Sequence, residues 1–109
     1  MNYVELVIGG ETYKLRLPIK NCAQLEKQLG CNPVQLLWNI DENILPKVSE
    51  IAILLQSMLS TYNHGITLEK TFELLEQYVA EGHKLFDLME VFVQVFRECG
   101  LIGKVEENE

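Results

Sequence analysis

The chain of 109 residues has the usual length of one domain, and its 48% of hydrophobic residues can fill a single core. Its formal net charge of −7 and its nine scattered Lys and Arg residues argue against a nucleic-acid-binding protein, which needs clustered cations. We therefore expect one domain, residues 1–103, followed by a flexible acidic tail, residues 104–109.

Residues 3–17 predict a β-hairpin. Apolar and polar residues alternate on both sides of Gly9-Gly10, a dipeptide that is typical of a two-residue turn. Only one register keeps apolar residues on one face and lets opposite charges meet on the other. The predicted opposite pairs are Leu6 with Tyr13, Val4 with Leu15 and Glu5 with Lys14.

Two short helices are expected next. Asn21 can cap the first, which runs through Leu29 and closes at Gly30. Asn32 followed by Pro33 predicts the start of the second, which ends at about residue 39.

Trp38 belongs to this second helix and leaves two interpretations open. A tryptophan among leucines usually packs in the core with Val34 and Leu37, but it is also a residue that anchors protein partners. A polar break at residues 41–43 separates this helix from the next one.

A central helix is predicted over residues 44–62, with Pro46 in its first turn. Its apolar residues recur at steps of three or four, so we expect the other elements to pack around it. Ile53 lies off this apolar face and could contact another chain. The residues of the face are Ile44, Val48, Ile51, Leu55, Met58 and Tyr62.

Thr67 is a suitable N-cap for the following helix. Its sequence predicts one buried face and one acidic, solvated face. The buried face should hold Leu68, Phe72, Leu75 and Val79, and the outer face Glu69, Glu73 and Glu76.

The last helix is expected over residues 84–99, ending at Gly100, with residues 101–109 as a frayed end. Its polar stripe is narrow and its apolar arc is wide, so the arc is either fully buried or partly covered by another chain. Phe86 and Val93 would then lie two turns apart on one line, opposite the polar stripe. The stripe consists of Asp87, Glu90, Gln94 and Arg97.

The cysteines and histidines, which could catalyse a reaction or bind a metal, do not have the spacing of a known catalytic or metal-binding motif. Cys22, Cys31 and Cys99 have neither CxxC nor zinc-ligand spacing, which favours free thiols in a reducing compartment. His64 and His83 fall in predicted loops. We expect no enzyme activity, no metal and no cofactor, and neither a secretory signal nor a membrane span.

The order of these patterns resembles the tail assembly chaperones of long-tailed bacteriophages and gene transfer agents. The resemblance covers about Val4 to Gly100. It rests on a hairpin running into TYKLRLPIKNCAQLEKQLG, the helix LPKVSEIAILLQSML, the segment ITLEKTFELLEQYVAEG and a terminal apolar helix.

The resemblance implies a cytoplasmic, non-enzymatic protein of the bacterial host cell that is absent from the mature virion. Such a chaperone binds and solubilises the tape measure protein and helps to recruit tail tube subunits. Candidate protein-binding residues are Ile53, Phe86 and Val93. The alternatives are a structural virion tail or head-tail completion protein, and a small cytoplasmic regulatory or enzyme subunit.

The predicted fold class is α+β, with an N-terminal antiparallel β-hairpin packed on a bundle of about four to five helices. The wide apolar arc of the last helix and the position of Ile53 also predict a homo-oligomer. We expect no nucleic-acid partner and no membrane partner.

Overall fold

Strands β1 (Val4–Ile8) and β2 (Glu11–Leu15) pair antiparallel around the turn at Gly9-Gly10. Both glycines have positive φ, 63° and 77°, which a two-residue hairpin turn requires and other residues rarely adopt. The predicted register is confirmed in full, with Leu6 opposite Tyr13, Val4 opposite Leu15 and Glu5 opposite Lys14.

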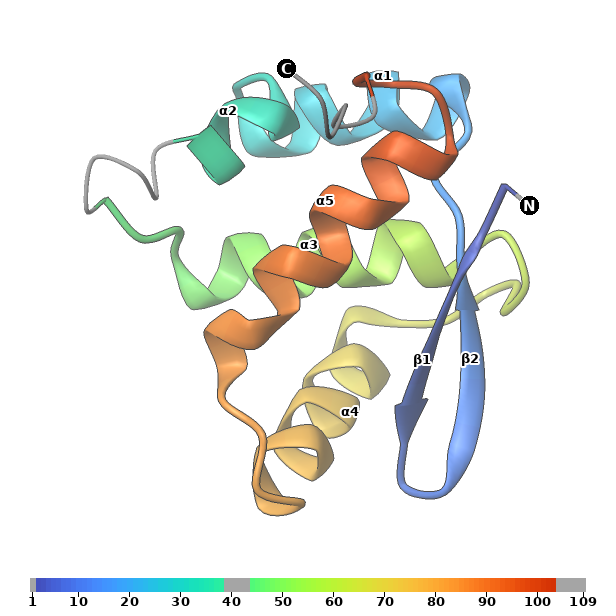
Figure 1. The fold of residues 1–109 in the computed structure, drawn as a ribbon, viewed down its shortest axis with the longest axis vertical. Coiled ribbons are helices and arrows are strands. Elements are labelled where there is room, and N and C mark those ends of the chain that lie inside the picture. The colour runs from blue at the N-terminus through green and yellow to red at the C-terminus, as the bar shows by residue number, and fades with distance from the viewer. Residues whose placement is uncertain (1, 39–43, 104–109) are drawn as a thin grey trace, which may run out of the picture.

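The computed structural model describes residues 2–38 and 44–103. In this part of the chain a two-stranded sheet and a set of helices form a mainly helical α+β domain, as predicted (Figure 1). The helices are α1 (Ile19–Leu29), α2 (Pro33–Trp38), α3 (Val48–Leu59), α4 (Leu68–Ala80), the 3₁₀ turn η2 (Leu85–Asp87) and α5 (Leu88–Glu98). The polar break predicted at residues 41–43 and the acidic tail 104–109 lie outside the described residues.

Helix α3 crosses the middle of the domain, and α1, α4 and β2 pack against it (Figure 1). Its central residues Ile51, Leu55 and Met58 are fully buried, as the periodicity predicted. The rest of the predicted face is wrong, since Ile44, Val48 and Tyr62 are 54%, 52% and 43% exposed. Both predicted ends of this helix are wrong, because α3 begins at Val48, two residues after Pro46, and ends at Leu59. The N–H of Lys47 donates to the Glu50 carboxylate at 2.7 Å, which fixes this start.

The first helix also begins earlier than predicted. Helix α1 starts at Ile19, directly after Pro18, and Asn21 does not cap it. The Asn21 amide instead donates to the Ser60 hydroxyl at the end of α3, 3.3 Å away. The predicted end is confirmed, since Gly30 closes the helix with a φ of 73°.

In α2 the side-chain oxygen of Asn32 accepts a hydrogen bond from the N–H of Val34 at 3.0 Å, so the predicted cap is confirmed. Val34 and Leu37 are buried. Trp38 is 61% exposed, so its placement in the core, the commoner of the two interpretations, is wrong. The core side of this short helix is already filled by four buried residues, Pro33, Val34, Leu36 and Leu37.

The hairpin is held against the helices by hydrogen bonds that its backbone N–H groups donate at both ends. The N–H of Arg16 donates to the carbonyl of Met58 in α3 at 2.9 Å. At the turn, the N–H of Gly9 donates to the Glu81 carboxylate at the end of α4, 2.8 Å away. Since an isolated hairpin is only marginally stable, these contacts and the packing of β1 on α5 support its conformation.

Candidate functional site

The three residues predicted to bind a partner differ in exposure. Phe86 is 38% exposed, whereas Ile53 and Val93 are partly buried and pack against the core. Phe86 therefore remains available to a partner. Ile53 and Val93 offer less surface, because part of each side chain already serves folding.

The structure also separates Phe86 from Val93. Phe86 lies in the 3₁₀ turn η2, and α5 begins only at Leu88, so the prediction that both residues lie on one helical line is wrong. The N–H of Lys84 donates to the Asp87 carboxylate at 3.2 Å and starts the 3₁₀ turn. A 3₁₀ turn has fewer residues per turn than an α-helix, so it changes the direction in which Phe86 points.

The wide apolar arc of the last helix is mostly covered within the chain. Figure 1 shows α5 lying across the domain, and α5 packs on β1 and α2. Of the two interpretations of this arc, burial in the core is correct for most of its residues. The buried residues are Leu88, Met89, Phe92, Val95 and Phe96.

Helix α4 exposes apolar residues that the sequence had assigned to the core. Leu68, Phe72 and Val79 are 36%, 38% and 47% exposed, while Leu75 is buried. The prediction of the buried face of α4 is therefore wrong for three of its four residues. At 3.6 residues per turn, the three exposed residues fall on one line along the helix, which we call the α4 stripe.

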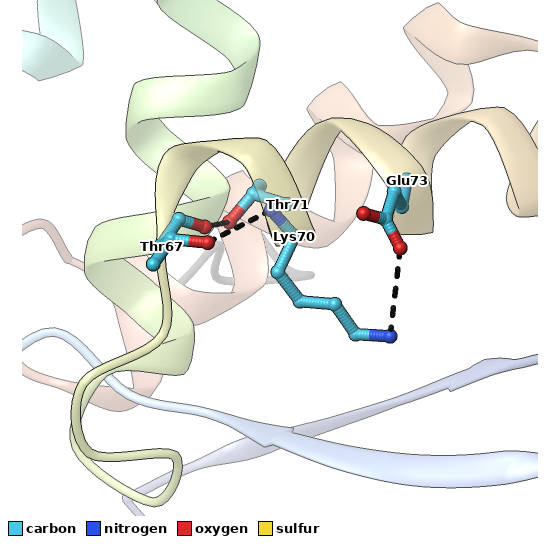
Figure 2. A network of polar contacts seen from close by, with 4 residues as sticks. All are labelled: Thr67, Lys70, Thr71 and Glu73. Atoms are coloured by element: carbon cyan, nitrogen blue, oxygen red, sulfur yellow. Dashed lines mark hydrogen bonds and ion pairs between the residues drawn. The ribbon is translucent and has the colours of Figure 1, made fainter.

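Two local hydrogen bonds fix the start of α4 and allow Thr71 to be buried. The Thr67 hydroxyl accepts a hydrogen bond from the N–H of Lys70 at 3.0 Å, which confirms the predicted N-cap (Figure 2). The Thr71 hydroxyl donates to the Thr67 carbonyl at 2.9 Å. Because this hydroxyl is satisfied locally, Thr71 can be fully buried and take a place in the core that an apolar residue was expected to fill.

Tyr78, like Thr71, carries a hydroxyl on the buried side of α4, where Leu74 is also buried. Its ring stacks on His83 with 4.3 Å between the ring centroids, which covers it at the end of the helix. Burial, with a smaller effect from the charge of Asp87, raises the pKa of the Tyr78 hydroxyl. With Thr71 and Tyr78 inside, the α4 stripe lies at the border between core and solvent.

A second apolar surface, the 44–48 patch, consists of Ile44, Leu45 and Val48, which are 54%, 55% and 52% exposed. Ile44 and Leu45 line a shallow pocket of about 200 Å³. One cation and one anion, Lys47 and Glu50, also line this pocket. The patch is therefore apolar and balanced in charge.

Two adjoining hollows of about 360 and 450 Å³ lie between β2 and α4. Both are lined by Glu11, Tyr13, Lys70 and Leu74, so their surface is mixed in charge. Burial, together with the charge and hydrogen bond of Glu11, raises the pKa of the Tyr13 hydroxyl. The hollows therefore offer polar groups of both signs and fit an apolar helix less well than the α4 stripe does.

The described residues contain no group of three or more His, Cys, Asp or Glu side chains placed to hold a metal ion. Within the same residues, no helix has both the length and the apolar character that crossing a membrane requires. Cys22, Cys31 and Cys99 are free cysteines, as predicted.

Sequence reasoning missed the α4 stripe because periodicity shows that a helix has an apolar face but not which part of it the core covers. The signal that could have revealed it was the width of that face. Apolar residues and Thr71 occupy a wide arc of α4, and α3, β1 and η2, which pack on this helix, leave part of that arc exposed.

The chain matches a known protein family. A family described as a family of unknown function, DUF6096, matches residues 4–109. No curated protein and no solved structure matches the chain.

Proposed function

We propose that this chain, which belongs to the DUF6096 family of unknown function, is a tail assembly chaperone of a long-tailed bacteriophage, a prophage or a gene transfer agent. In this role it binds the tape measure protein, keeps it soluble and helps to recruit tail tube subunits. It acts in the cytoplasm of the bacterial host, has no enzymatic activity and is absent from the finished particle.

The observation that carries the proposal is the α4 stripe. Leu68, Phe72 and Val79 present apolar side chains along one line of a helix, and Phe86 is exposed on η2, which packs beside α4. A chaperone for a long, largely helical client needs such a surface, because an amphipathic helix hides its apolar face on a complementary apolar surface. The resemblance described from the sequence supplies the identity of the client.

The proposed surface replaces part of the set chosen from the sequence. Phe86 stays in it, since it is exposed, and Phe72 and Val79 take the place of Val93. Ile53 and Val93 are less suitable, because polar substitutions there would disturb the core against which they pack.

Self-association is a separate part of the proposal. The apolar arc of α5 is mostly buried, so we assign self-association to the 44–48 patch instead. Lys47 and Glu50 beside this patch have opposite charges, so two copies can meet there without repulsion between like charges.

The test is co-expression with a tape measure protein encoded beside this chain. The wild type should keep the tape measure protein in the soluble fraction, and the double variant Phe72→Ser, Val79→Ser should not. Ile19→Ser is a matched control, because Ile19 is 75% exposed on another helix and outside the proposed surface. Circular dichroism should show that all variants stay folded.

A structural virion protein is distinguished by analysis of purified particles. The proposal expects the tape measure protein in the particles and this chain absent from them. Particles that contain this chain in stoichiometric amounts would favour the virion alternative. Failure of the wild type to keep the tape measure protein soluble would overturn the chaperone proposal.

A further inference from the structure

The α4 stripe has acidic side chains along its solvent side. On the surface of α4, Glu69 and Glu76 fall on the line next to the stripe, on the side away from buried Leu75. Both glutamates are exposed. The stripe itself extends from Leu68 to Val79, which is about 16 Å of helix at 1.5 Å per residue.

The charge beside the stripe is not neutralised by neighbouring cations. The one ion pair of α4 in the described residues joins Lys70 to Glu73, at 4.0 Å and with both side chains more than half exposed (Figure 2). Glu73 lies one line further around the helix from the stripe than Glu69 and Glu76. The two glutamates next to the stripe are therefore available to a partner's charges.

We propose that the α4 stripe binds an amphipathic helix that carries Lys or Arg residues beside its apolar face. The apolar side chains of such a helix cover Leu68, Phe72 and Val79, and its cations lie against Glu69 and Glu76. A stripe of about 16 Å accommodates about three turns of a partner helix.

The same charges disfavour other occupants. A second copy of α4 would bring its own Glu69 and Glu76 towards these glutamates, and like charges at an interface disfavour pairing. An anionic membrane surface would also be repelled. The acidic border of the α4 stripe thus differs from the balanced charge of the 44–48 patch.

This inference rests on the proposed function for the identity of the client, because it predicts which segments of a tape measure protein are bound. They are segments in which apolar residues at helical spacing are flanked by Lys or Arg. The chemistry of the surface itself is tested without the tape measure protein.

The experiment uses the full chain and two synthetic amphipathic peptides with the same leucine face. One peptide has lysines on its polar face and the other has glutamates in the same positions. Binding is measured by fluorescence anisotropy at low and moderate salt. We expect the lysine peptide to bind more tightly than the glutamate peptide, and its affinity to fall as salt screens the charges.

Two sets of variants separate the apolar and the charged contributions. The double variant Phe72→Ser, Val79→Ser should weaken binding of the lysine peptide by more than about tenfold. The double variant Glu69→Gln, Glu76→Gln should weaken it by about fivefold and reduce its salt dependence. Glu26→Gln is the matched control, since Glu26 is an exposed glutamate on α1.

Equal binding of both peptides would overturn the inference, and so would equal losses in the Glu26 control and the Glu69/Glu76 variant. A wild type that solubilises the tape measure protein but does not bind the lysine peptide would overturn this inference alone. A wild type that binds the lysine peptide through α4 but leaves the tape measure protein insoluble would support the inference and overturn the proposed client.

Discussion

The N–H of Leu17, just after the hairpin, donates a hydrogen bond to the thiol sulfur of Cys99 at the end of α5, with 3.2 Å between nitrogen and sulfur. The same sulfur lies 3.6 Å from the Asn2 carbonyl, to which the thiol donates. Cys99 thus joins the N-terminal strands to the last helix, across 82 positions of sequence.

Cys99→Ala should therefore destabilise the domain. The substitution leaves the N–H of Leu17 without its acceptor in a partly buried position, which lowers the free energy of unfolding by about 1–2 kcal/mol. Cys99→Ser keeps an acceptor atom and should lose less. Urea denaturation of the three proteins measures the difference, and equal stability of the alanine variant would mean that water replaces the thiol.

Thr67→Ala tests the cap that sets the start of α4. Loss of the hydroxyl leaves the N–H of Lys70 without its partner, so the free energy of unfolding should fall by about 1 kcal/mol. Thr67→Ser keeps the accepting oxygen and should be close to the wild type. If the serine variant lost as much as the alanine variant, the methyl group of Thr67 rather than its hydroxyl would stabilise the helix.

Much of the fold follows from local chemistry that the sequence displays. The register of the hairpin was predictable because turn glycines, alternating residues and opposite charges agree on one pairing. The caps at Asn32 and Thr67 were predictable for the same reason, since each depends on residues within one turn.

The orientation of each helix was not predictable, because it depends on contacts between distant residues. Phe72 is exposed and Thr71 is buried on the same helix, and no local rule distinguishes them once the Thr71 hydroxyl is satisfied. The packing of the residues just after α5 was not predictable either. Leu101 and Ile102 were expected in a frayed end, yet they pack against the core, and the N–H of Leu101 donates to the Phe96 carbonyl at 2.9 Å.

Val93→Ser and Phe86→Ser should both lower the free energy of unfolding. Val93→Ser places a hydroxyl beside the core and should lower it by about 1–2 kcal/mol. Phe86 is 38% exposed, so more than half of its ring is covered, and Phe86→Ser should also lower it by about 1–2 kcal/mol. Thermal denaturation of the two variants measures both losses. An unaffected Val93 variant would contradict the packing of Val93 against the core.

The reactivity of Cys22 should depend on Glu26, one turn further along α1. Burial first, and the charge of Glu26 second, raise the pKa of the Cys22 thiol above its ordinary value of 9.0. A raised pKa means less thiolate at a given pH, so iodoacetamide should alkylate Cys22 more slowly than a cysteine in a short peptide.

Glu26→Gln removes the negative charge but leaves the burial unchanged, so the pKa of Cys22 should fall part of the way towards 9.0 and its alkylation should accelerate. Mass spectrometry of the Cys22 peptide over a pH series measures this. Because the pKa is raised in the folded state, the contribution of Cys22 to stability is present below pH 9.0 and declines above it. An unchanged pH profile in the Glu26 variant would mean that burial alone sets the pKa.

Self-association through the 44–48 patch is the remaining prediction. Ile44, Leu45 and Val48 are each more than half exposed, and burying such side chains between two copies removes apolar surface from water. The wild type should therefore sediment as a closed homo-oligomer that dissociates on dilution, since closed symmetric assemblies are the usual outcome for one self-complementary surface.

Leu45→Ser with Val48→Ser should shift this equilibrium to the monomer, and Ile19→Ser should not, although Ile19 is more exposed than either residue. Raising the salt concentration should have little effect, because Lys47 and Glu50 beside the patch balance each other. Analytical ultracentrifugation over a wide range of protein concentration measures all three proteins. A wild type that stays monomeric throughout would contradict self-association, and an oligomer that persists in the Leu45/Val48 variant would place the contact elsewhere on the molecule.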